Sequence, residues 1–127
     1  MKRIVLTRRM KLALWVGLCV ILFNGIDYVL DARMRARMLP ECRWEEDRPY
    51  QNTIPYLVRW CIVKRDVVMF RVYDKEGKKL LAERMFDYPD LPLIYWSSKE
   101  VGYRTFSDWG AVALPPSALD EWRTHLP

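Results

Sequence analysis

Hydrophobic positions along this chain form one long run near its start and several short alternating runs after it. The long run extends from Met10 to Leu30, and its strictly apolar centre covers residues 12–23. A transmembrane helix needs about 20 mostly apolar residues. Residues 12–30 approach this length when Asp27 and Tyr28, which suit the membrane–water interface, are included. The pattern therefore predicts a transmembrane helix over residues 12–30.

A cleaved secretory signal is the alternative to an uncleaved anchor, because it has the same basic start and apolar centre. Cleavage needs small residues just before the cut, and the large residues Phe23 and Leu30 occupy such positions here. A lipoprotein signal fits no better, since Leu18 precedes Cys19 inside the run. We prefer the uncleaved anchor and keep a secreted domain released from its signal as the alternative.

Basic residues flank the apolar run on both sides, with more of them before it than after it. Asp27 and Asp31 further dilute the positive charge on the C-terminal side. By the positive-inside rule, the N-terminus stays in the cytoplasm and the rest of the chain is exported. We therefore expect a bacterial inner-membrane protein with a periplasmic C-terminal domain. The basic residues expected to meet lipid headgroups are Lys2, Arg3, Arg8, Arg9, Lys11, Arg33, Arg35 and Arg37.

The residues around the run define the predicted domain organisation. Residues 1–11 form a basic cytoplasmic tail. Residues 31–39 are rich in good helix formers and precede Pro40, so we expect the membrane helix to continue through them as a helical stalk. Residues 40–127 then form the periplasmic β-rich domain.

The alternating runs predict an antiparallel meander in this domain. Residues 56–64 form the strongest strand, and residues 67–73 and 78–87 follow it. Arg65 and Asp66 suit a tight turn, and residues 74–77 end in a glycine that suits a hairpin loop.

The rest of the domain gives weaker signals. Short strands are expected at residues 93–96, 103–106 and 111–114, with a polar loop at 97–102 and a turn at 108–110, whereas residues 41–55 are expected to be irregular.

A short C-terminal helix is predicted at residues 118–125. Ser117 suits its N-cap, and we expect Leu119, Trp122 and Leu126 to pack against the sheet. The predicted fold class is a single N-terminal transmembrane α-helix plus a small mostly-β (α+β) exported domain, an antiparallel meander with a short C-terminal helix.

The net charge of +5 belongs to the membrane flanks and not to the domain. Residues 1–39 carry eight basic and two acidic residues, a net charge of +6. Residues 40–127 carry thirteen basic and fourteen acidic residues, a net charge of −1. A nucleic-acid-binding domain needs a basic surface, so we exclude nucleic acid as a partner.

Two of the three cysteines follow the apolar run. Cys42 and Cys61 are exported in the predicted orientation, and an even number of cysteines in an oxidising compartment favours a disulfide. Two separate free thiols are the alternative. Cys19 lies inside the apolar run, where a thiol behaves as a small hydrophobic group.

Motifs that would carry catalysis are missing from the sequence. It has no glycine-rich phosphate loop, no G-x-S-x-G motif and no H-E-x-x-H motif. His125 lies close to the C-terminus, where a side chain is seldom held in a cleft. The acids at 45–47 lack the spacing and the glycine of a calcium loop. We therefore predict a protein that is not an enzyme and that needs no metal and no cofactor.

Aromatic residues are unusually frequent in residues 40–127. We assign Trp60 and Trp122 to the core, because aromatic side chains bury much area. Those in predicted loops or short strands are candidates for an interface, since Trp and Tyr dominate binding hot spots. These candidates are Trp44, Tyr50, Tyr88, Tyr95, Trp96 and Trp109.

Three features together indicate a binding function: the membrane anchor, the nearly zero net charge of the exported domain, and its many aromatic residues. We expect the exported domain to bind another envelope protein, in a regulatory, assembly or immunity-type role, with the lipid bilayer as its other partner. One alternative is a membrane-tethered binder of a small molecule or a glycan that uses the loop aromatics. A further alternative is an enzyme that uses carboxylates scattered along the sequence.

Overall fold

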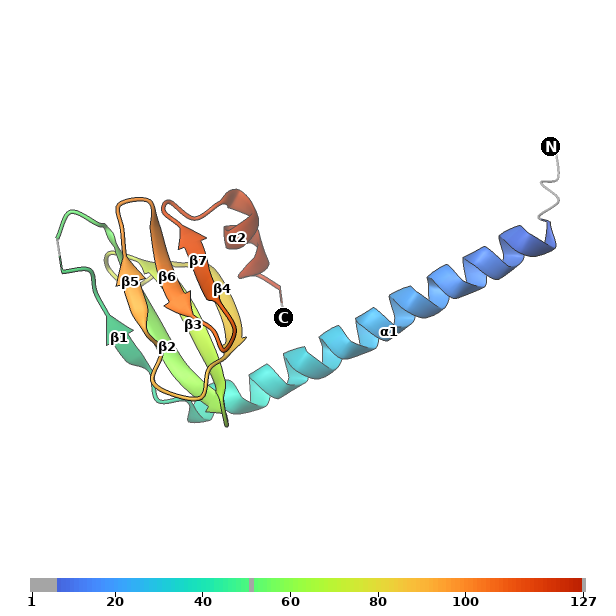
Figure 1. Ribbon diagram of the computed structural model, residues 1–127, viewed down its shortest axis with the longest axis horizontal. Coiled ribbons are helices and arrows are strands. Elements are labelled where there is room, and N and C mark those ends of the chain that lie inside the picture. The colour runs from blue at the N-terminus through green and yellow to red at the C-terminus, as the bar shows by residue number, and fades with distance from the viewer. Residues whose placement is uncertain (1–6, 51, 127) are drawn as a thin grey trace. The chain divides into compact units, whose positions relative to one another are not determined.

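The computed structural model describes residues 7–50 and 52–126 (Figure 1). The chain forms two compact units, residues 1–37 and residues 38–127. The first contains most of one long helix, and the second contains all the strands and a short C-terminal helix.

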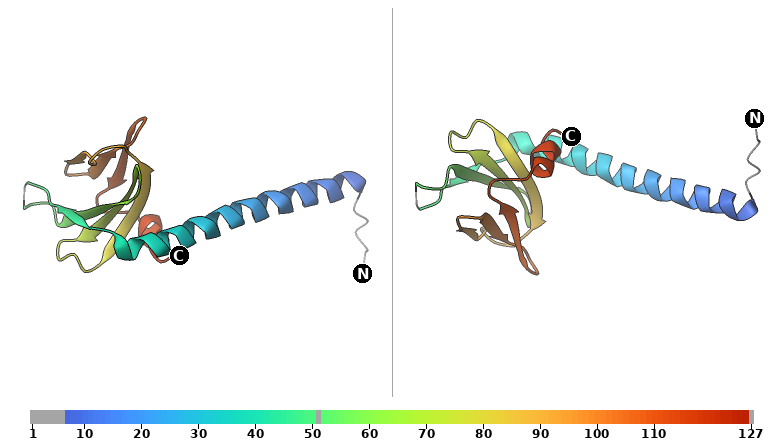
Figure 2. Two further views of the ribbon diagram at one scale, coloured as in Figure 1. Left: turned by 90° about the horizontal axis from the view of Figure 1, so that it is seen from below. Right: turned by 90° about the horizontal axis from the view of Figure 1, so that it is seen from above.

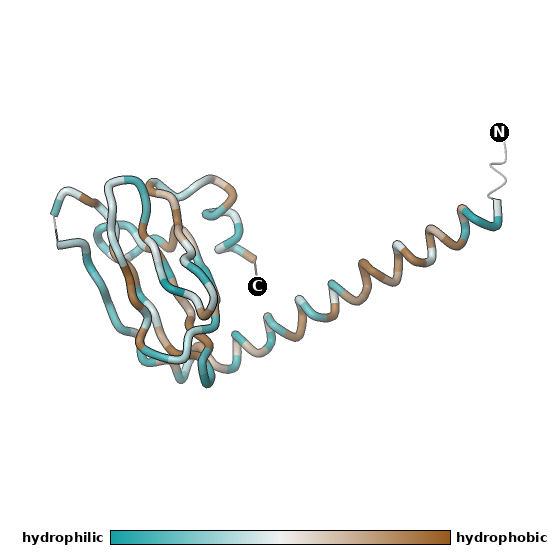
Figure 3. The backbone as a smooth tube through the Cα atoms, viewed as in Figure 1, coloured by the Kyte–Doolittle hydropathy of each residue, from teal (hydrophilic) through white to brown (hydrophobic). Residues whose placement is uncertain are grey.

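The long helix α1 covers Arg8–Met38, 31 residues, so its length is about 46 Å. None of its residues is buried, and hydrophobic residues dominate its central part (Figure 3). Its one amide side chain, Asn24, donates to the carbonyl oxygen of Val20 at 2.7 Å. The helix is long and apolar enough to cross a membrane, a property that anchors and signal sequences share. A short 3₁₀ helix, Leu39–Glu41, follows it.

The first β-sheet has four antiparallel strands in the order β1-β2-β3-β4. Their bounds are Glu45–Asp47, Tyr56–Lys64, Val67–Asp74 and Leu80–Asp87. Strands β2 to β4 form the predicted antiparallel meander, which is thereby confirmed. The turn residues Asp66 and Gly77 have φ angles of 65° and 71°, the left-handed backbone expected of a tight turn and a hairpin glycine.

The second β-sheet has three antiparallel strands in the order β5-β6-β7, with bounds Ile94–Trp96, Glu100–Arg104 and Trp109–Ala113. The short helix α2, Ala118–Arg123, follows the last strand. Ser117 caps α2 in a capping box with Asp120, which confirms the predicted N-cap.

One hydrophobic core is shared by the two sheets, which lie in two layers (Figure 2). Phe70 of β3, Phe86 of β4 and Tyr103 of β6 meet at its centre, with ring centroids 4.4–6.3 Å apart. Valines from β2, β3, β6 and β7 surround these rings. Trp60 is half-buried and packs against this core, as predicted.

The structure contains strand residues where the sequence pattern predicts none. Strand β1 lies within the stretch expected to be irregular, because its three acidic residues have no strand propensity of their own. Strand β6 begins inside the expected loop at 97–102, and β7 begins inside the expected turn at 108–110. Glycines at 102 and 110 weaken both strand patterns.

Helix α2 presents a different face to the sheet from the one predicted. Asp120 is its buried residue, with 8% of its surface exposed, whereas Trp122 is 58% exposed. Leu119 and Leu126 are exposed as well. The expectation that these three apolar residues pack against the sheet, with Trp122 in the core, is therefore wrong. The reason is that Asp120 forms an ion pair with Arg84 of β4, which turns the apolar residues outward.

A disulfide joins Cys42, which follows the 3₁₀ helix, to Cys61 of β2. Their Cα atoms lie 5.8 Å apart, and 19 positions separate them in sequence. The bond fastens the segment between α1 and β1 to the second strand of the first sheet. Cys19 is a free, exposed thiol on α1.

Candidate interaction surface

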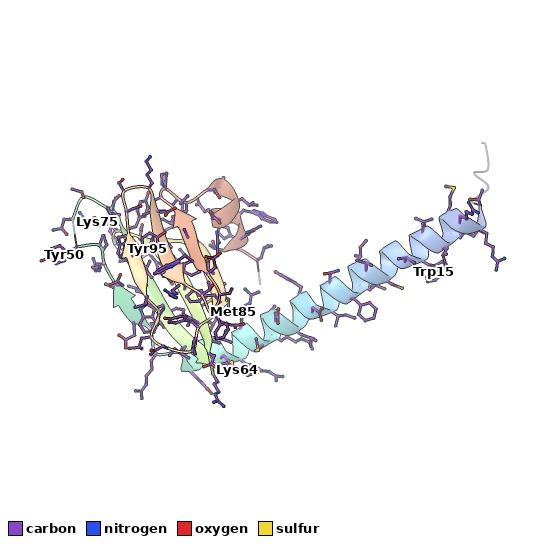
Figure 4. The ribbon with its side chains drawn as sticks, in the orientation of Figure 1. Trp15, Tyr50, Lys64, Lys75, Met85 and Tyr95 are labelled. Atoms are coloured by element: carbon purple, nitrogen blue, oxygen red, sulfur yellow. A yellow bond between two sulfur atoms is a disulfide. The ribbon has the colours of Figure 1, made fainter. Side chains whose placement is uncertain are left out.

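Two of the six candidate interface aromatics, Tyr95 and Trp109, come together on one surface. Tyr95 lies on β5, opposite Gly102 of β6. Trp109 begins β7 and lies opposite Arg104 of β6. Figure 4 labels Tyr95 on the second sheet and Tyr50 in the loop after β1. The remaining four aromatics lie elsewhere and are described below.

The surface is the face of the second sheet that points away from the core. Side chains alternate across a sheet, and Val101, Tyr103 and Val112 point inward. The opposite face carries two cross-strand rows. We call their six residues the aromatic face: Leu93, Tyr95, Gly102, Arg104, Trp109 and Ala111.

Contacts within the aromatic face fix the orientation of its rings. Tyr95 and Trp109 meet edge to face with ring centroids 5.4 Å apart, a favoured geometry for aromatic pairs. The Arg104 guanidinium lies 5.5 Å from the centroid of the Trp109 ring, within the range of a cation–π interaction. Tyr95 donates a hydrogen bond to the Glu100 carboxylate at 2.7 Å, and this bond raises the pKa of the Tyr95 hydroxyl above its ordinary value.

Gly102 is the residue that lets the Tyr95 ring lie flat on the sheet. A Cβ added at position 102 would overlap the ring carbons of Tyr95. The two residues are direct cross-strand partners. A glycine beneath an aromatic ring in this way compensates for the weak strand propensity of glycine.

The other four candidates lie away from the aromatic face, and two of them, Tyr50 and Trp96, line one open hollow. Trp96 is half-buried against the core, and its Nε1 donates to Asp47 of β1 at 2.7 Å. Tyr88 packs against the same core. Trp44 lies under the guanidinium of Arg71, 4.9 Å from the ring centroid. Tyr50 is fully exposed.

Arginines on the outer face of the first sheet are engaged by neighbouring acids. Residues 46, 59, 71 and 83 form one row across its four strands. Arg59 pairs with Glu46 at 3.1 Å, and Arg71 pairs with Glu83 at 2.7 Å. Hydrogen bonds from Arg48 and Arg59, together with the positive charges of the two arginines, lower the pKa of the Glu46 carboxyl. Because each guanidinium already has a carboxylate partner, this row is poorly suited to bind an anionic ligand.

The membrane-flank basic residues lie at both ends of α1. Lys2 and Arg3 lie outside the described residues. Arg8, Arg9 and Lys11 occupy the first turn of the helix. Arg33, Arg35 and Arg37 occupy its last turns, after the apolar part.

The β domain has an open groove of about 380 Å³. Three apolar and three charged residues line it. We call the apolar ones, Trp60, Ile62 and Leu91, its floor, and the charged ones, Glu41, Arg43 and Glu45, its rim. The sequence pattern did not single out this groove, because its lining comes from three separate segments of the chain, residues 41–45, residues 60–62 and Leu91.

Sequence reasoning also missed Arg104 and Gly102 as parts of the aromatic face. The available signal was that Gly102 and Arg104 are two positions apart, so that both lie on the same face of a strand. This signal can be used only once β6 is known to be a strand. Within residues 7–50 and 52–126, no group of three or more His, Cys, Asp and Glu side chains is placed to hold a metal ion.

The fold and these surfaces define a long apolar helix followed by a disulfide-bonded, two-sheet β domain. Comparisons of the chain with protein-family models, with curated protein sequences and with solved structures found no match.

Proposed function

We propose that this chain is a membrane-anchored bacterial protein whose exported β domain binds another protein of the cell envelope without catalysing a reaction. The observation that carries the proposal is the aromatic face. It combines Trp109, Tyr95 and Arg104 in one cluster, and Trp, Tyr and Arg are the residues most enriched in binding hot spots.

Contacts within the sheet hold the two rings of the aromatic face. The ring of Tyr95 is supported by Gly102 and held by Glu100, and Trp109 is held by both Tyr95 and Arg104. Side chains that are already ordered lose little conformational entropy on binding. Both rings nevertheless remain accessible, with 38% and 47% of their surfaces exposed.

Two features support an exported location for the domain. An apolar helix near the N-terminus precedes it, and its Cys42–Cys61 bond is of a kind that persists in oxidising compartments. A charge excess confined to residues 1–39 is consistent with orientation by the positive-inside rule.

Site-specific photo-crosslinking in the membranes of the native host tests this function. A photoreactive residue at Ala111, on the aromatic face, should give one dominant protein adduct. Trp109→Ala should remove most of that adduct. The matched control Trp122→Ala also deletes an exposed tryptophan and should leave the adduct unchanged. No adduct at position 111, or equal loss with both variants, would reject the proposal.

Binding of a glycan to the same rings is the competing function. Sugars stack on open aromatic faces, but Arg104 already lies over the ring of Trp109, so only Tyr95 offers an unobstructed ring. If purified wall glycan protects tryptophan fluorescence from quenching in the wild type and not in Trp109→Ala, the glycan function replaces the protein partner.

A further inference from the structure

The open groove lies beside an unpaired sheet edge. Strand β1 is the edge strand of the first sheet, and in the described chain its only strand partner is β2. Edge strands present free backbone N–H and C=O groups that a further strand can pair with. Glu45 of β1 lines the groove and is the direct cross-strand partner of Trp60 on its floor. A strand added to β1 would therefore continue the row that contains Glu45 and Trp60.

The floor of the groove is apolar and accessible. Ile62 is 50% exposed, and Leu91 is exposed beside it in the loop between β4 and β5. Trp60 is half-buried, so the core of the domain reaches the surface here. Apolar area of this kind favours contact with an apolar side chain of a partner.

Unpaired negative charge borders this floor. Across residues 7–50 and 52–126, neither Glu41 nor Glu45 forms an ion pair, whereas Glu46 pairs with Arg48 and Arg59. Asp47, the remaining acid of β1, accepts the hydrogen bond from Trp96. Arg43 is the single basic residue of the lining, so the carboxylates outnumber it. The rim is thus complementary to a basic side chain.

We propose that the groove binds an extended peptide segment of a partner protein that pairs with the free edge of β1. Its inward side chains carry an apolar residue, which contacts Trp60, Ile62 and Leu91, and a basic residue two positions away, which meets Glu41 and Glu45. Strand addition is an established mode of peptide recognition. The proposal shares with the proposed function only the assumption that the partner is a protein, because it uses a separate surface.

Binding of synthetic peptides to the full chain in phosphatidylcholine nanodiscs tests this groove. The probe is a fluorescent, acetylated and amidated Lys-Thr-Leu-Thr-Lys-Thr peptide, followed by anisotropy against empty nanodiscs. Saturable binding is expected to weaken tenfold or more in Glu45→Lys and in Ile62→Asp. The matched controls Glu76→Lys and Met85→Asp make the same changes at exposed positions away from the groove. They should retain wild-type affinity.

Changes to the peptide and the buffer separate the parts of the proposal. Replacing both lysines with glutamate should abolish binding, and raising the salt concentration should weaken it, because the charges are exposed. Two methylated peptides test the strand pairing. One carries methyl groups on the backbone nitrogens of the three threonines, and the other carries them on the remaining three backbone nitrogens. Because the two sets of N–H groups point to opposite edges of the peptide strand, only one of the two methylated peptides should fail to bind. Equal effects of both sets, equal binding of the acidic peptide, no saturable binding, or equal losses in the control variants would each overturn the proposal.

The two proposals can fail separately. Trp109→Ala should remove the crosslinked adduct of the aromatic face and leave peptide binding to the groove intact. Ile62→Asp should weaken peptide binding to the groove and leave the crosslinked adduct of the aromatic face unchanged. Loss of peptide binding in Trp109→Ala would reject the groove as an independent site.

Discussion

Two tyrosines each lie on a glycine in the second sheet, one on either side of it. Tyr95 covers Gly102 on the outer face, and Tyr103 covers Gly110 on the core face. Glycine normally weakens a strand because it contributes no side chain to pack. Here each ring occupies the space that a Cβ of the residue beneath it would fill. The same local arrangement thus supports both the hydrophobic core and the aromatic face.

Substituting Gly102 with alanine should therefore be harmful only while Tyr95 is present. We expect Gly102→Ala to lower the free energy of unfolding by about 1–3 kcal/mol, because the new methyl group displaces the ring. In a Tyr95→Ala background the same change should be neutral or stabilising, since alanine restricts the unfolded chain more than glycine does. Urea unfolding of the four variants in a double-mutant cycle measures the coupling. An equal cost in both backgrounds would contradict the packing described for Tyr95.

Asp120 links α2 to β4 through an ion pair whose strength depends on pH. Burial alone would raise the pKa of this carboxyl, but hydrogen bonds from Arg84 and Ser117 outweigh it, so the pKa lies below its ordinary value. A carboxyl whose pKa is depressed in the folded state contributes stability above its unfolded pKa of about 3.9 and loses it as the pH falls through the folded pKa.

Asp120→Asn should consequently destabilise the domain most at neutral pH. We expect a loss of about 1.5–3 kcal/mol at pH 7, the range for hydrogen bonds to charged groups. The difference from the wild type should shrink as the pH falls below about 4, because the unfolded chain then takes up a proton that the folded carboxyl binds only at lower pH. Chemical unfolding from pH 7 to pH 2 checks this, with Glu76→Gln as an exposed-acid control. A difference that is constant with pH would exclude the charged pair as its cause.

At the scale of elements, α2 shows how one polar contact overrides a hydrophobic pattern. Leu119 and Trp122 of this helix, with Leu126 just after its end, follow the apolar spacing that usually marks a buried side. Asp120 lies on the other side. It pairs with Arg84 of β4 and accepts a hydrogen bond from the N-cap residue Ser117, and these contacts place that side against β4. The apolar residues are left exposed as a consequence.

Removal of Trp122 should accordingly cost little stability. We expect Trp122→Ala to change the free energy of unfolding by less than about 0.5 kcal/mol, as for other surface substitutions. Phe70→Ala, in the centre of the core, should cost about 3–5 kcal/mol. Far-UV circular dichroism during urea unfolding compares the two. A cost above about 2 kcal/mol for Trp122→Ala would mean that α2 buries this side chain after all.

The elements that sequence could predict are those whose pattern is local. Strands β2, β3 and β4 alternate clearly, and the Ser117 cap is a local signal as well. Strand β1 depends on distant partners instead, since Glu46 pairs with Arg59 and Asp47 with Trp96. Only part of the aromatic face could be predicted, because its residues are also brought together by pairing between strands. Tyr95 and Trp96 are adjacent in sequence, and only the pairing of β5 decides which one points outward.

For the whole molecule, the central issue is which compartment the β domain occupies and whether α1 stays attached to it. The three cysteines report on both questions. Cys42 and Cys61 form the disulfide of the β domain, and Cys19 is a free thiol on α1. A disulfide persists in an oxidising compartment and is reduced in the cytoplasm. Cleavage after the apolar run would remove Cys19 from the mature chain.

Counting alkylated thiols by intact mass therefore tests anchoring and export together. In acid-quenched cells we expect a full-length chain of 15.3 kDa that carries one alkyl group without reductant and three after reduction. A cleaved signal predicts a shorter chain with none before reduction and two after it. A chain that stays in the cytoplasm predicts three alkyl groups in both samples. Cys19→Ser is the control, because it should remove one group from the uncleaved chain and leave the disulfide intact. Among these outcomes, only the one-to-three change agrees with an uncleaved anchor and an exported, disulfide-bonded β domain.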